Sequence, residues 1–208
     1  MAQTDTLTPL LNPAHSATAG NKQDAVRLHG DLALWIIILS ELMVFALFFA
    51  AYAFTRANHV ELFIQEQAGL DRNSGAINTL LLLTSSFFVV RAVQSSERGH
   101  NHASARWLLG ALACGAGFIV IKLWEFILKY NEGVSLSSNL FHMFYLSLTF
   151  FHFLHVVLGM VILAALWNGA RRNLYTPDHM HGLESGAAYW HMVDLVWLIL
   201  FPLVYVMR

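Results

Sequence analysis

The stretch FHMFYLSLTFFHFLHVVLGM, residues 141–160, decides how this chain folds. It lies within an apolar run, residues 139–167, that contains no Asp, Glu, Lys or Arg. An α-helix needs about 20 predominantly apolar residues to cross the hydrocarbon layer of a membrane. The run therefore predicts a transmembrane helix, and its histidines need a separate explanation.

Four further apolar runs of the same kind occur, at residues 32–55, 77–94, 107–128 and 187–207. The whole chain is 57% hydrophobic and 12% charged, whereas a soluble domain has about 25% charged residues. The runs are uniformly apolar, while strands of a membrane barrel alternate over about ten residues. We therefore predict an all-α, polytopic membrane protein, with a bundle of five transmembrane helices over residues 31–208.

Residues 1–30 contain Asn, Thr, Pro, Gly and His without a helical period, which predicts a flexible cytoplasmic tail. Positive residues near short loops tend to stay on the cytoplasmic side of a membrane. With the N-terminus inside, the inner segments hold Lys22, Arg27, Arg91, Arg98, Arg106, Arg171 and Arg172. The outer segments hold Arg56, Arg72, Lys129 and Arg208. This asymmetry favours an internal N-terminus and an external C-terminus.

Small residues indicate where helices approach closely, because membrane helices pack through small side chains. Gly110, Cys114 and Gly117 share a face of one helix, and Gly159 follows the histidines of another. Cys114 is the only cysteine and is interpreted as a packing residue. The net charge of −1, without a basic block, offers no binding surface for nucleic acid.

Ionisable residues within apolar runs are costly and need a partner or a task. Glu41 lies well inside the first run, where it predicts either a hydrogen bond to another helix or a proton-handling group. Lys122 and Glu125 are three residues apart, so their side chains can meet on one helix as a structural ion pair.

The fourth run carries His142, Tyr145, Thr149 and His152 at helical spacing, with His155 on an adjoining face. This stripe predicts interhelical hydrogen bonds. In the fifth run, His191 and Asp194 are again three residues apart, and an aspartate so placed can orient a histidine.

A metal site or haem is the alternative interpretation of these side chains. None of the apolar runs contains the Glu-x-x-His pattern that di-metal bundles repeat, and the single cysteine excludes a Cys-x-x-Cys-His haem attachment. One histidine from each of two helices, such as His155 and His191, would still suffice to hold a haem.

Several segments together resemble subunit III of the haem-copper respiratory oxidases. They are ILSELMVFALFFAAY (38–52), INTLLLLTSS (77–86), KLWEFILKYNEG (122–133), LTFFHFLHVVLG (148–159) and YWHMVDLVWLILFPLVYV (189–206). The resemblance covers residues 29–208, in order, and is to the five-helix bacterial type. GALACGAGFIVIKLWE (110–125) and the C-terminal segment are most similar to the NorE-like proteins associated with nitric oxide reductases.

The resemblance implies a subunit of the bacterial inner membrane, with a cytoplasmic N-terminus and a periplasmic C-terminus. Such a subunit carries no haem or copper itself and has no catalytic residue. It binds phospholipid, packs against a catalytic subunit that holds haem and possibly copper, and supports that partner's proton uptake. The matching positions are Glu41, Glu125, His152, His155, His191 and Asp194.

Two other functions remain open from the sequence. A stand-alone membrane oxidoreductase would hold haem or a metal between His152 or His155 and His191. A small proton-conducting transporter would use Glu41 and the histidines, although the chain lacks the internal repeats and broken helices usual in transporters.

Overall fold

The computed structural model describes residues 32–176 and 179–207, and within these residues the chain is helical without a β-strand. The long helices are α1 (Leu32–Asn58), α3 (Arg72–Glu97), α4 (Asn101–Asn131), α5 (Leu140–Arg171) and α6 (His181–Phe201). A short helix, α2 (Val60–Ala68), follows α1, and a π-helical turn, η1 (Pro202–Val206), follows α6. The predicted tail at residues 1–30 and Arg208 lie outside the described residues.

The five predicted runs each coincide with one long helix, but the helices extend further. Helix α3 begins at Arg72 rather than 77, and α6 begins at His181 rather than 187. Apolar residues are needed only within the hydrocarbon layer, so a helix can continue through the headgroup region with polar residues. The fourth run was predicted to begin at residue 139, whereas helix α5 begins at Leu140. Asn139 is the N-cap of this helix.

Helix α2 was not predicted from the sequence. It is too short to cross a membrane and buries Phe63 and Gln67 against the bundle. The ring of Phe63 packs edge-on against Tyr52 of α1 and Phe141 of α5. Helix α2 therefore covers one end of the bundle.

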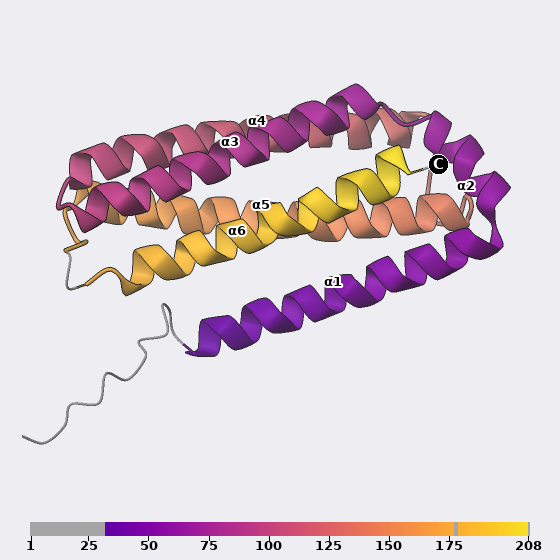
Figure 1. The fold of residues 1–208 in the computed structure, drawn as a ribbon. Coiled ribbons are helices and arrows are strands. Elements are labelled where there is room, and N and C mark those ends of the chain that lie inside the picture. The colour runs from indigo at the N-terminus through magenta and orange to yellow at the C-terminus, as the bar shows by residue number, and fades with distance from the viewer. Residues whose placement is uncertain (1–31, 177–178, 208) are drawn as a thin grey trace, which may run out of the picture.

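Among the described residues, five helices are long and apolar enough to span a membrane, as the sequence predicted, so the chain is a multi-pass membrane protein. Helices α3 and α4 pair along one side, α5 and α6 lie beside them, and α1 forms the opposite edge (Figure 1). In the most apolar stretch of each helix, 56% of residues are buried in the α6 span but only 11% in α1. Helix α6 is thus central, and α1 is peripheral.

The connections alternate between two ends of the bundle. Helix α2, the α4–α5 loop and the C-terminal turn lie at one end, which we call the α2 end (Figure 1). The start of α1, the α3–α4 turn, the end of α5 and the start of α6 lie at the opposite end. Gly99 allows the tight α3–α4 turn because its φ of 77° is one that glycine adopts without steric cost.

Candidate functional site

Glu41 of α1 pairs with His155 of α5 in the middle of the membrane-spanning region. Oε2 of Glu41 lies 3.1 Å from Nε2 of His155, and their side chains are 36% and 17% exposed. The other ring nitrogen, Nδ1, lies 2.7 Å from the backbone carbonyl of Phe151. A carbonyl only accepts, so Nδ1 must carry a hydrogen and donate it.

This geometry requires a proton between the two side chains. If Nδ1 carries the hydrogen of a neutral imidazole, Nε2 is an acceptor that faces a carboxylate oxygen, also an acceptor. A hydrogen bond at 3.1 Å therefore needs one further proton, either on Glu41 or on Nε2 of His155. The hydrogen bond between α1 and α5 is therefore present only while one of the two side chains holds this proton.

A second acid–base group lies deep within the bundle toward the α2 end. Lys122 donates to Oε2 of Glu125 at 3.1 Å, so the pair indicated by the three-residue spacing forms. Tyr145 and Tyr205 donate to Oε1 of Glu125 at 2.5 and 2.6 Å. The hydroxyl of Tyr205 also accepts from Lys122 at 2.6 Å. We call these four residues the Lys122–Glu125 cluster.

The Lys122–Glu125 cluster is almost closed to solvent. Lys122 is fully buried, and Glu125 is 8% exposed. Four aromatic rings surround the ammonium group at 5.2–5.5 Å, those of Phe126, Tyr145, Trp197 and Tyr205. A buried charge is tolerated only when it is paired and hydrogen-bonded, and here each charged group has several partners. The cluster thus fastens α4, α5 and the C-terminal turn together.

His152, three residues before His155, points into the core instead of toward α1. It is fully buried, stacks on Trp197 at 5.1 Å and meets Phe118 edge-on at 5.8 Å. Neither of its ring nitrogens hydrogen-bonds to another described residue. The interhelical hydrogen bonds predicted for it are therefore replaced by aromatic packing, because the facing side chains at its depth are rings.

His191 and Asp194 of α6 do not form the expected pair. Nδ1 of His191 lies 2.5 Å from the hydroxyl of Ser86 on α3. Asp194 is 5% exposed, and neither of its oxygens has a hydrogen bond of good geometry to a described residue, although Ser86 interacts with its side chain. Ser86 of α3, which the sequence did not single out, thus interacts with both of these α6 residues.

The small residues lie at close helix contacts. A Cβ added to Gly110 would lie 3.0 Å from Phe88, and one added to Gly117 would lie 3.3 Å from Leu81, both on α3. A Cβ on Gly159 would lie 2.8 Å from Trp190 of α6. Cys114 is a half-buried free thiol. These glycines let α3 pack on α4, and α6 on α5, through large side chains.

In residues 32–176 and 179–207, side chains that could bind a metal ion are not gathered into one site. No group of three or more His, Cys, Asp or Glu side chains there is placed to hold a metal ion. The two histidines considered as haem ligands have different partners, Glu41 for His155 and Ser86 for His191.

Comparison with known proteins agrees with the arrangement of spans. A sequence model of the family described as cytochrome c oxidase subunit III matches residues 13–208. The chain belongs to this family. The subunit III resemblance found in the sequence is therefore confirmed.

Related subunit III proteins come from several kinds of oxidase. Cytochrome c oxidase subunit 3 of Thermostichus vulcanus is 31% identical over 177 residues, which cover 85% of this chain and 86% of the relative. Quinol oxidase subunit 3 of Bacillus subtilis is 30% identical over 176 residues, covering 85% and 86%. Heme-copper oxidase subunit I+III of Aeropyrum pernix is 32% identical over 182 residues, which cover 83% of this chain and 22% of the relative.

The residues of this subunit III chain that make contacts across the α2 end were not predicted from the sequence. Nε2 of Gln67 donates to the backbone carbonyl of Val204 at 2.9 Å and to the hydroxyl of Tyr52 at 3.2 Å. Arg56 donates to the carbonyl of Met207 at 3.0 Å. These contacts satisfy carbonyls at the end of the last helix. Pro202, which interrupts the last apolar run, was the available signal for an irregular turn.

Proposed function

We propose that this chain is an accessory, non-catalytic subunit of a bacterial haem-copper oxidase or nitric oxide reductase-type complex, and that it stabilises the catalytic subunit. The observation that carries the proposal is membership of the subunit III family over nearly the whole chain. The Aeropyrum pernix relative, named as subunit I+III, supports a catalytic subunit I as the partner. Haem, and copper where present, would reside in that partner.

Co-purification from the native membrane tests the assignment. A tagged chain, extracted in mild detergent at its native level of expression, should bring down a haem-containing subunit that shows a reducible absorbance spectrum. Recovery of the chain alone, under conditions that keep other membrane complexes intact, would contradict the accessory role. Haem in the isolated chain would favour the stand-alone oxidoreductase instead.

The Glu41–His155 pair supports a role in the partner's proton uptake. The pair lies at the edge of the bundle where α1 is least buried, it is partly exposed, and its hydrogen bond requires one proton shared by the two side chains. The Lys122–Glu125 cluster is less suited to this role because its groups are buried and already bonded to one another.

Glu41→Gln is the direct test of that role. The amide retains a hydrogen bond to His155 but cannot release a proton at physiological pH, so partner turnover should fall several-fold while the complex still co-purifies. Ser40→Ala is the matched control, because Ser40 is exposed and bonds only within its own helix, to the carbonyl of Ile37. Unchanged turnover in Glu41→Gln, or loss of assembly, would assign the pair a structural role.

Two finer assignments belong to the same proposal. The NorE-like resemblance favours a nitric oxide-reducing partner, which the substrate reduced by the co-purified complex would decide. The orientation, with the N-terminus in the cytoplasm and the C-terminus in the periplasm, is supported by basic residues near the α3–α4 turn and the end of α5, both opposite α2: Arg91, Arg98, Arg106, Arg171 and Arg172. Labelling of cysteines placed in the α3–α4 and α4–α5 connections of intact cells tests it.

A further inference from the structure

Helices α1 and α2 together form an arm that is less deeply packed than the other helices. In the most apolar stretch of each spanning helix, at least 28% of residues are buried in α3–α6 but 11% in α1. The buried residues of α1 are Ile38, Phe45 and Tyr52. We call α1 and α2 the α1–α2 arm and the other helices the α3–α6 core. The few contacts between the arm and this core therefore decide where α1 lies.

Helix α5 meets the arm through a histidine at two levels. Nε2 of His155 lies 3.1 Å from Oε2 of Glu41 in α1. Near the start of α5, Nε2 of His142 lies 3.7 Å from Oε2 of Glu66 in α2. Each contact joins an imidazole of the α3–α6 core to a carboxyl group of the arm. We call the two contacts the His–carboxylate pairs.

Asn139 fixes the hydrogen positions of the second pair. Its Nδ2 donates to Oε1 of Glu66 at 2.8 Å, so its Oδ1 is the atom that faces His142. This Oδ1 lies 2.9 Å from Nδ1 of His142 and also accepts from the backbone N–H of the same residue. Because an amide oxygen only accepts, Nδ1 carries a hydrogen and donates it. In neutral His142, Nε2 is therefore an acceptor that faces a second acceptor in Glu66.

Both His–carboxylate pairs consequently respond to protons in the same direction. A neutral imidazole has one N–H, and in each pair that hydrogen is already bonded to an acceptor other than the carboxylate. One further proton allows a hydrogen bond between His155 and Glu41, and it gives His142 a positive charge beside Glu66. The docked arm thus binds more protons than a detached arm would. A rise in pH therefore weakens docking.

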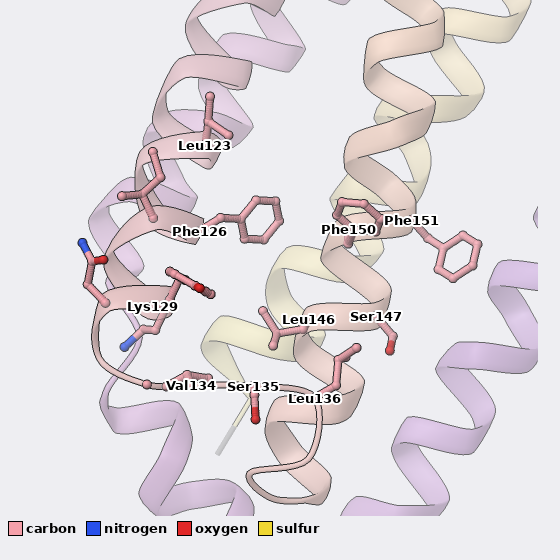
Figure 2. A pocket seen from close by; sticks show the side chains of 14 residues that line it. Leu123, Phe126, Lys129, Val134, Ser135, Leu136, Leu146, Ser147, Phe150 and Phe151 are labelled. Atoms are coloured by element: carbon pink, nitrogen blue, oxygen red, sulfur yellow. The ribbon is translucent and has the colours of Figure 1, made fainter.

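Other titratable groups near the pairs do not link the arm to the core in this way. Among the described residues they are Arg56 of α1, His152 of α5, Tyr189 of α6, and Lys129 and Glu132 of α4. Arg56 and Lys129, which Figure 2 shows at the end of α4, donate to backbone carbonyls, and these do not titrate. His152 lies among aromatic rings, and the hydroxyl of Tyr189 has no hydrogen bond to another described residue.

The two ends of the arm are attached unequally. At the α2 end, Tyr52 is fully buried, and Gln67 donates to the carbonyl of Val204 at 2.9 Å without needing a further proton. In the described part of α1 that precedes Glu41, Ile38 is the only buried residue. Loss of the hydrogen bond to α5 should therefore free the start of α1, with the α2 end as the pivot.

We propose that the α1–α2 arm is a pH-sensitive element: protons on the two His–carboxylate pairs hold it against α5, and loss of these protons lets the start of α1 move away from the α3–α6 core. The inference rests on the two pairs and on the low burial of α1, and it does not depend on the proposed function. Proton binding within the bundle is thereby coupled to the position of its outer helix.

Distances between spin labels test the proposal in the full chain, reconstituted in lipid nanodiscs. With Cys114 replaced by alanine, labels are placed at two exposed positions, Leu109 of α4 and Ile36 of α1. The distance between these labels should lengthen, and its distribution should broaden, as the pH is raised from acidic to alkaline. Labels at Leu109 and Val161, both in the α3–α6 core, are the control and should keep one distance at every pH.

Glu41→Gln removes the need for the proton, because the amide donates to Nε2 of neutral His155. The distance measured from Ile36 should then stay short at every pH. Ser40→Ala is the matched control and should keep the wild-type response, because Ser40 bonds only within its own helix. His155→Gln covers the case in which Glu41→Gln misfolds, since its amide donates to the carboxylate of Glu41 and should also abolish the response.

A label at Gln65 of α2, measured from Leu109, reports on the second pair. It should show a smaller response to pH than Ile36, and Glu66→Gln should remove that response. A wild-type distance from Ile36 that is the same at every pH overturns the proposal. A wild-type response in folded Glu41→Gln and His155→Gln also overturns it, as does an equal change in the control distance, which would indicate general unfolding.

Discussion

The two acid–base groups of this bundle differ in what surrounds them. Glu41 and His155 join a peripheral helix to the bundle, remain partly exposed, and share one hydrogen bond that requires a proton. Lys122 and Glu125 are enclosed by four helical segments and aromatic rings, and two tyrosine hydroxyls complete their hydrogen bonding. The Lys122–Glu125 cluster therefore joins three helical segments through several hydrogen bonds, whereas the contact between α1 and α5 depends on one hydrogen bond and on one proton.

Glu125→Gln should give the largest effect on stability. It leaves the ammonium of Lys122 buried without a carboxylate, and breaking a buried ion pair from one side costs about 3–5 kcal/mol. Unfolding in detergent micelles, followed by circular dichroism in denaturant, measures the loss. The double variant Lys122→Met with Glu125→Gln should recover part of it, since no unpaired charge remains. A loss below about 1 kcal/mol in the single variant would contradict the assigned role.

Tyr205→Phe should have the next largest effect. It removes a hydroxyl that both accepts from Lys122 and donates to Glu125, and a buried group left unsatisfied costs about 1–3 kcal/mol. Tyr145→Phe is the matched variant, since its hydroxyl makes only the bond to Glu125 among these contacts. The same unfolding assay should show the smaller loss for Tyr145→Phe. Equal losses would indicate that the bond from Lys122 to Tyr205 contributes little.

Asp71→Ala should have the smallest effect and gives a reference outside the spans. Asp71 caps α3 by accepting from the backbone N–H of Asn73, and loss of an N-cap costs about 1 kcal/mol. The hydroxyl of Ser74, together with backbone donors, lowers the pKa of this exposed carboxyl below its ordinary value. Its stabilisation is therefore complete above that ordinary value and declines as the pH falls through the lowered pKa. A wild-type and Asp71→Ala difference that persists in strong acid would contradict this cause.

Much of the fold was predictable because crossing a membrane imposes a length and a composition on each helix. The runs at residues 32–55 and 139–167 needed no knowledge of their neighbours to be identified as spans. One of the two side-chain pairs expected from a three-residue spacing also formed, whereas His191 and Asp194 do not pair. Lys122 and Glu125 meet because residues three apart share a helix face.

Contacts between distant segments were not predictable from spacing. The pairing of Glu41 with His155 depends on which face of α5 meets α1, and two histidines three residues apart gave no means to choose between them. The two histidines make different contacts because His155 faces Glu41 of α1, whereas His152 faces Trp197 of α6. Helix α2 was missed because Val60–Ala68 is polar at several positions and too short for a clear period.

The π-helical turn at the C-terminus makes the chain sensitive to length as well as to composition. Each residue of an α-helix turns the next side chain by about 100°. Deleting a single residue between Trp197 and Tyr205 would swing the phenol away from Lys122 and expose a different side of the turn to the bundle. A one-residue deletion there would therefore remove the phenol from the Lys122–Glu125 cluster, although the segment would remain apolar throughout.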